Sequence, residues 1–217
     1  MAINKIKLIE YSGKVDFFNC LTHAFGAALA VIGFILMILK ADTARKTVSA
    51  LIFGISLVTV YTVSAVYHGL RQGEKKRIAR LIDHSAVPFL IAGTASPCAL
   101  ITLYEINIPC SIALLFLAWF CTVFGLVSKL FFFYKLRKVT VAVYIISCAA
   151  MLCFAIPFLG EINSGAFGGI LIGNALYLIG AAFCGMGIKR PALHIVFHVF
   201  TVMASSVHFL VIYVYML

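Results

Sequence analysis

Residues 189–200 read KRPALHIVFHVF, and this stretch crosses from a polar segment into an apolar run that continues almost to Leu217. It places His194 and His198 four residues apart inside a segment apolar enough for a membrane. On an α-helix this spacing puts both imidazoles on one face, about one turn apart, which suits two ligands of a single metal ion. Ionisable residues inside a membrane span are costly and indicate a functional site. The stretch therefore predicts a membrane helix that carries part of a metal centre.

The composition of the whole chain excludes a soluble globular protein. Of its 217 residues, 64% are hydrophobic and only 11% are charged, and the mean hydropathy is +1.11. These values are typical of a polytopic membrane protein. The formal net charge of +10 could suggest nucleic acid as a partner, but the positive residues lie between the apolar runs. They are topology signals, so we expect no nucleic-acid binding.

Apolar runs of about 20 residues, separated by short polar segments, predict an all-α integral membrane protein. We expect a single domain over residues 1–217, built as a bundle of seven transmembrane helices. The spans are expected at about 17–39, 47–70, 83–103, 108–132, 139–159, 166–188 and 191–217.

The distribution of positive charge predicts the orientation of this bundle. Of the 17 Lys and Arg residues, 14 fall on one side of the predicted membrane, and only Lys40, Arg45 and Lys46 fall on the other. Cytoplasmic segments carry the excess of Lys and Arg in membrane proteins. We therefore expect a cytoplasmic N-terminus and a C-terminus outside.

This topology brings polar residues from three spans to one depth near the cytoplasmic face. The second span ends with Ser64 and His68, the third begins at Asp83, and the seventh carries His194 and His198 within its first two turns. Three imidazoles and a water form the usual open, catalytic zinc site. Asp83, the only acidic residue expected to enter a span, could bind the metal directly, or hold its water and accept a proton. Ser64 could orient that water or a substrate carbonyl.

Zinc suits imidazole ligands with an open position, although other first-row metals accept the same ligand types. Two further interpretations stay open: the histidines could simply form hydrogen bonds between helices, or they could relay protons. In the first span His23, with Asn19 one turn before it, could support the site from behind the ligands. His208 lies about 15 Å along the helix from His198, too far to share an ion, and is expected to pack or form a hydrogen bond.

The sixth span carries a stripe of glycines at four-residue steps, Gly165, Gly169 and Gly173. Small residues at this spacing let a neighbouring helix approach closely. We favour packing inside the bundle over a dimer interface.

Taken in order, the motifs resemble the hemolysin III family, the bacterial branch of the progestin and adipoQ receptor (PAQR) superfamily. The matching pieces are NCLTHAFG at 19–26, SAVYH at 64–68, DHSA at 83–86, IAGT at 91–94, HIVFH at 194–198 and VHF at 207–209. The resemblance implies a seven-helix bundle with a cytoplasmic N-terminus. It also implies Zn²⁺ bound by the residues matching His68, His194 and His198, with the match to Asp83 contacting it through water. In related receptors and ceramidases such a site is linked to hydrolysis of lipid amides, and the family favours a bacterial cytoplasmic (inner) membrane.

Our leading hypothesis is a zinc-dependent hydrolase that acts on a lipid amide or ester, with membrane lipids as its partners. Zinc would polarise the carbonyl and lower the pKa of its water to about 7, while Asp83 takes the proton. The basic rim near the site would attract anionic head groups or simply orient the protein. The rim comprises Arg71, Lys75, Lys76, Arg77 and Arg80.

The alternative is a non-enzymatic sensor or regulator of membrane state in which zinc ties the spans together. Pore formation, suggested by the family's name, has less support because no span outside the site carries a repeated polar stripe. The sequence identifies no protein partner.

Overall fold

The structure, a computed structural model, describes residues 6–9 and 11–217. The chain is 87% helical, and the described residues contain no strand. Within this described part, seven helical segments are long and apolar enough to cross a membrane, as the sequence predicts.

These seven segments run almost the full length of the described chain. The main helices are α1 (Gly13–Lys40), α2 (Ala44–Gly69), α3 (Glu74–Pro97), α5 (Ile108–Phe132), α6 (Arg137–Ala155), α7 (Ser164–Gly187) and α8 (Ala192–Val211). Short segments prolong three of them, namely η2 (Cys98–Leu103) and α4 (Tyr104–Ile106) after α3, η3 (Ile156–Phe158) after α6, and η4 (Ile212–Met216) after α8.

Side-chain caps fix where several helices begin. Thr43 accepts a hydrogen bond from the Lys46 N–H at the start of α2, and the Asn107 side chain accepts one from the Cys110 N–H at the start of α5. Such caps satisfy backbone donors that have no partner within the helix. The π-helical segment η2 follows directly after Pro97, which lacks a backbone N–H for the regular ladder.

Two helices begin at least four residues earlier than the predicted spans, and this matters for the site. Helix α3 begins at Glu74, because residues 74–82 (EKKRIARLI) favour a helix, and Gly73 before it takes a φ of 151° that glycine tolerates. Helix α1 begins at Gly13, so that Asp16 lies in its first turn. The structure thus places Asp16, which the predicted spans leave in the polar segment before them, on the first helix.

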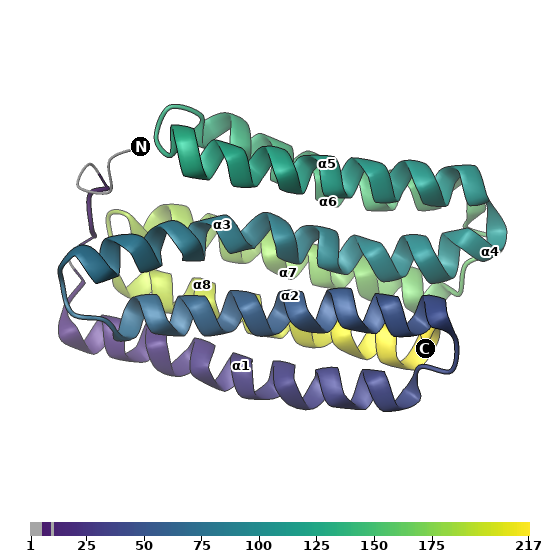
Figure 1. Ribbon diagram of the computed structural model, residues 1–217, viewed down its shortest axis with the longest axis horizontal. Helices are drawn as coiled ribbons and strands as arrows, with labels where there is room; N and C mark the ends of the chain where they lie inside the picture. Colours follow the sequence, from purple (N-terminus) through teal and green to yellow (C-terminus); the bar gives the residue numbers. More distant parts are fainter. Residues whose placement is uncertain (1–5, 10) are drawn as a thin grey trace.

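The helices run side by side along the long axis of the molecule, with the two described chain ends at opposite ends of the bundle (Figure 1). Helix α1 packs on α2 and α8, α2 on α3, α3 on α5, α5 on α6, and α7 on α8. Met37, Phe53 and Ile212 are fully buried between these helices, whereas Phe17 and Phe116 on the outside are exposed. Apolar residues on both the inner and outer faces are expected of helices in lipid.

The glycine stripe of α7 packs against α8, which confirms the predicted packing inside the bundle. A Cβ atom at Gly169 would overlap Val211, and one at Gly173 would overlap the ring of His208. His208 Nε2 lies 3.3 Å from the Ile170 carbonyl oxygen, so the hydrogen-bonding role expected for His208 is also confirmed.

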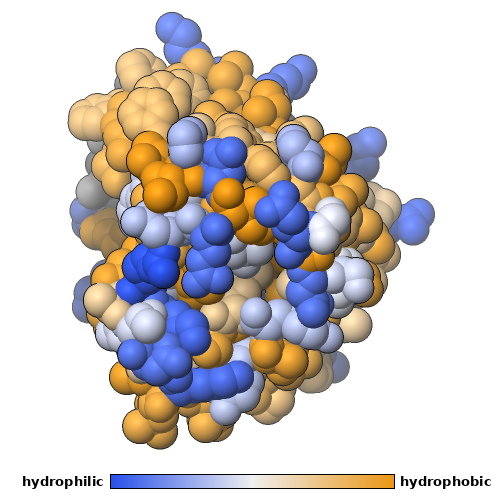
Figure 2. Space-filling model, turned by 90° about the vertical axis from the view of Figure 1, so that its right-hand side faces the viewer, coloured by the Kyte–Doolittle hydropathy of each residue, from blue (hydrophilic) through white to orange (hydrophobic). Residues whose placement is uncertain are grey.

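The two ends of the bundle differ in the polar residues that they carry. Figure 2 shows one end, where hydrophilic residues gather near the centre and apolar residues surround them. Ion pairs at this end join Arg45 to Glu105 at 3.7 Å and Lys46 to Asp42 at 3.0 Å. We call the opposite end, where α1, α3 and α8 begin and α2 ends, the histidine end.

Candidate metal centre

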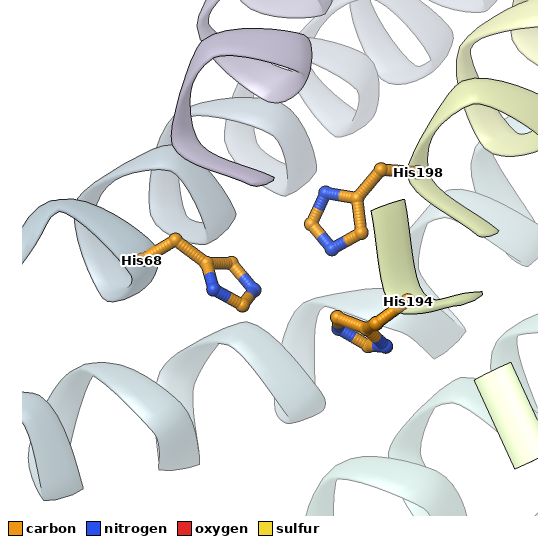
Figure 3. A group of neighbouring side chains, drawn as sticks. All are labelled: His68, His194 and His198. Atoms are coloured by element: carbon orange, nitrogen blue, oxygen red, sulfur yellow. The ribbon is translucent and has the colours of Figure 1, made fainter. Parts of the chain in front are cut away.

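Three histidines from two helices meet at the histidine end. His68 lies in the last turn of α2, and His194 and His198 lie in the first two turns of α8, with the three rings turned toward one another (Figure 3). One nitrogen from each ring lies within 4.8 Å of the other two. Two nitrogens bound to one zinc ion at about 2.1 Å lie at most about 4.2 Å apart. The three nitrogens therefore need to approach one another only slightly to bind a single ion.

Asp16 fixes the orientation of His68. The Asp16 Oδ1 atom lies 3.0 Å from His68 Nδ1, whereas the Asn19 amide nitrogen lies 3.4 Å from the same atom. The shorter contact indicates that Nδ1 carries the ring hydrogen and donates a hydrogen bond to the carboxylate. His68 Nε2 then has a free lone pair, which is the form required of a metal ligand.

Lys76 holds the other oxygen of the same carboxylate. Its Nζ atom donates to Asp16 Oδ2 at 2.7 Å and to the Leu70 carbonyl at 3.1 Å, and its side chain is only 1% exposed. A buried ammonium needs such partners because the loss of its hydration is costly. Helices α1, α2 and α3 are thus joined by one polar network beside the histidines.

The ring nitrogens fit a bound cation. Among the described residues, His68 Nε2 and His198 Nδ1 are buried side-chain atoms without a hydrogen-bond partner. Buried polar atoms normally have partners, because an unsatisfied one costs stability. Imidazoles with unused lone pairs, grouped in this way, are suitable ligands for zinc and for other first-row divalent ions.

The structure places the two expected supporting residues, His23 and Asn19, beside the histidine group. Both are buried on α1, and the His23 ring lies 3.7 Å from the His198 ring, centroid to centroid. Both His23 ring nitrogens lack a hydrogen-bond partner among the described residues. His23 lies outside the group of three whose nitrogens could bind one ion.

Asp83 and Ser64 lie next to each other, also outside the group of three. Ser64 is buried in α2, and its hydroxyl interacts with the partly buried carboxyl of Asp83 on α3. Their catalytic roles, and the contact of Asp83 with the metal through water, remain predictions. His84 turns away and meets the Phe133 ring edge-on at 5.4 Å.

Tyr11 covers the histidines, and the sequence analysis did not predict its role. Its ring stacks on His194 at 5.4 Å with an interplanar angle of 18°, and lies 5.7 Å from the His68 ring. Burial raises the pKa of its hydroxyl, so Tyr11 stays neutral. Tyr11 lies in the polar segment before the first span and belongs to no motif or periodic pattern that would predict this contact.

The segment around Tyr11 runs across the histidine end. Ile6 is 1% exposed, and the Lys7 N–H donates to the hydroxyl of Tyr134, between α5 and α6, at 2.8 Å. These contacts on the N-terminal side of Tyr11, and the start of α1 at Gly13 on its C-terminal side, limit how far its ring can move from His194.

Replacing Tyr11 by alanine is expected to expose His194. An aromatic pair contributes about 0.5–1.5 kcal/mol, so opening should become roughly two- to tenfold more frequent. We expect diethyl pyrocarbonate to modify His194 faster by this factor, measured by mass spectrometry on chelator-treated protein. Tyr11→Phe keeps the ring and should behave as wild type. Equal rates in all three proteins would show that Tyr11 does not shield the site.

Comparison with known proteins gives matches along nearly the whole chain. The profile of the family described as haemolysin-III related matches residues 12–209. Hemolysin-3 from Bacillus cereus is 30% identical over 207 residues, covering 94% of this chain and 93% of the relative. The hemolysin-3 homolog of Bacillus subtilis (strain 168) is 28% identical over 205 residues, covering 93% and 94%. The human monocyte to macrophage differentiation factor is 23% identical over 205 residues, covering 91% and 83%.

Proposed function

The chain belongs to the haemolysin-III related family, and on that premise we propose that it is an integral membrane protein that binds zinc and hydrolyses a lipid amide or ester. The observation that carries this proposal is the grouping of His68, His194 and His198, with one nitrogen of each ring within 4.8 Å of the others. When bound, zinc would supply a Lewis acid and a water of lowered pKa.

The residues around the histidines have complementary tasks. Asp16 holds His68 in the tautomer that leaves Nε2 free, and Lys76 holds Asp16. Asp83 would accept the proton of the attacking water, and Ser64, which interacts with that carboxyl, would orient the water or the substrate carbonyl. Tyr11 and the bundle core would keep bulk water from the reacting groups.

The bundle would lie in a bacterial cytoplasmic membrane with the histidine end toward the cytoplasm and the C-terminus outside. The distribution of Lys and Arg along the sequence supports this orientation, since 14 of the 17 fall in polar segments on the same predicted side of the membrane. The substrate would then reach the site from the cytoplasmic leaflet or from the cytoplasm.

Hydrolysis of fluorogenic long-chain acyl amides and esters by the purified protein tests the enzymatic proposal. We expect turnover that is lost with a chelator, restored by zinc, and reduced about 10²–10⁴-fold in Asp83→Asn, because general-base catalysis contributes that much. The zinc content of Asp83→Asn should equal that of wild type. Turnover that survives both the chelator and this substitution would contradict the proposal.

A second candidate is a sensor or regulator of membrane state with a structural metal. It is favoured by the way in which the three ligands join α2 to α8. The His68→Ala variant separates the two. A folded but inactive variant supports the hydrolase. A variant that is unfolded at a temperature where the wild-type protein is folded supports the structural metal.

A further inference from the structure

Tyr61 lies on the same face of α2 as His68, two helical turns further from the histidine end. Seven residues separate the two, which is about 10.5 Å along the helix axis. Ser205 stands in the same relation to His198 on α8, seven residues further from the histidine end. Because α2 ends and α8 begins at the histidine end, Tyr61 and Ser205 lie at one level of the bundle, as His68 and His198 do.

The Tyr61 hydroxyl joins α2 to α8 at this level. Its oxygen lies 3.0 Å from the Thr201 carbonyl oxygen and 2.5 Å from Ser205 Oγ, both on α8. On the other side of Ser205, the hydroxyl oxygen of Tyr177 on α7 lies 2.5 Å from the same Oγ atom. The three hydroxyl hydrogens suffice for these three contacts. A polar network in which every member has its partner holds the helices that carry it in one arrangement.

Packing also fixes the ring of Tyr61. The residue is 2% exposed, and its ring meets the His23 ring edge-on, with 5.1 Å between the centroids and an interplanar angle of 81°. Gly26 on α1 leaves room for the ring, since a Cβ atom there would lie 3.0 Å from the nearest Tyr61 ring atom. A tyrosine side chain has only two χ angles, so a ring held in this way fixes the position of its hydroxyl.

The position of α2 relative to α8 decides whether the three histidines can share one ion. His68 approaches the group from α2, and His194 and His198 approach it from α8 on the opposite side (Figure 3). Helix α1 packs on both α2 and α8, whereas α2 and α8 meet each other chiefly through side chains. A displacement of about 1 Å between them would exceed the roughly 0.5 Å within which a metal site must be held. The hydrogen bonds of Tyr61 oppose such a displacement.

We propose that Tyr61 is a positioning residue of the metal centre: its hydrogen bonds to α8 hold α2 where His68 reaches the ion bound by the two α8 histidines. Tyr177 supports the contact from α7 by holding Ser205. The inference rests on the metal binding of the proposed function but not on hydrolysis, since it concerns the metal-bound protein before any substrate enters. Loss of the Tyr61 hydroxyl would leave the two α8 ligands in place and loosen the third.

Cobalt binding tests this role, because Co²⁺ accepts the same imidazole ligands as Zn²⁺ and its visible absorption depends on the number and arrangement of those ligands. Tyr61→Phe keeps the ring and removes the hydroxyl. We expect this variant to bind both ions about tenfold more weakly, the lower end of the effect of residues that orient metal ligands. Its cobalt complex should absorb more weakly, because a loosened ligand is replaced by water. A general loss of stability would leave the spectrum of the loaded protein unchanged.

Tyr144→Phe is the matched control. The Tyr144 hydroxyl is also buried, but it lies on α6 and has no hydrogen-bond partner among the described residues. Metal affinity should stay within about twofold of wild type in this variant, and the cobalt spectrum should be unchanged.

Ser205→Ala removes one of the two contacts of Tyr61 and should weaken metal binding about threefold, which is half the effect of Tyr61→Phe in free energy. Adding Ser205→Ala to Tyr61→Phe should cause no further loss, because both substitutions break the same link between α2 and α8.

Wild-type metal affinity and a wild-type cobalt spectrum in Tyr61→Phe would overturn the positioning role while leaving the metal centre intact. Equal weakening by Tyr61→Phe and Tyr144→Phe would overturn it as well. A wild-type protein that binds neither ion would contradict the metal centre itself, and the positioning role with it. If Tyr61→Phe does not fold, Ser205→Ala is the test, and wild-type metal binding in that variant would show that the network only stabilises the bundle.

Discussion

The Asp16→Ala variant is expected to lose about 3 kcal/mol of unfolding free energy and to bind zinc about 10–100-fold more weakly. The loss of stability comes from Lys76, whose side chain is 1% exposed and would keep a buried charge without its carboxylate. We use the lower end of the range for a broken buried pair because the Asp16 side chain is 17% exposed. The loss of affinity comes from His68, which would no longer be held in one tautomer.

A double variant separates the two effects. Asp16→Leu combined with Lys76→Met replaces both charges by apolar groups, and this should restore most of the stability. Zinc affinity should stay low, because His68 Nδ1 still lacks its acceptor. Chemical denaturation and zinc titration of the purified proteins measure the two quantities. Wild-type zinc affinity in Asp16→Ala would show that the carboxylate serves only to neutralise Lys76.

The Gly173→Val variant is expected to lose about 3 kcal/mol of unfolding free energy, because added atoms in a packed contact force the neighbouring helices apart. A side chain there would overlap the His208 ring and push α7 away from α8. Gly168 is the matched control, since a Cβ atom there meets nothing within 4 Å. Gly168→Val should stay within about 0.5 kcal/mol of wild type. Equal melting temperatures for the two variants would show that α7 does not pack on α8 in this way.

The sequence predicted the seven spans and the histidine group because both depend on short-range patterns. Runs of apolar residues mark the spans, and the four-residue step between His194 and His198 marks one face of a helix. His68 was placed beside His194 and His198 from the topology alone, because α2 ends at the same end of the bundle where α8 begins. These predictions did not depend on the path of any connecting loop.

The contacts of Asp16, Tyr11 and Lys76 could not be predicted in the same way. The predicted spans leave Asp16 and Lys76 in polar segments, but α1 and α3 begin before the apolar runs and include both residues. A helix can extend beyond the hydrocarbon layer without any change in hydropathy to mark where it begins. Tyr11 stacks on His194 from the segment before α1, whose sequence has no hydrophobic periodicity that would predict the contact.

Elemental analysis of the detergent-purified protein tests the central claim, that the three histidines bind one metal ion. The comparison is with a His194→Ala, His198→Ala double variant that still folds, as judged by its circular dichroism. We expect about one zinc ion per chain in the wild-type protein and almost none in the variant. Equal and negligible metal in both would contradict the metal centre, and the histidines would then be packing or proton-relay groups.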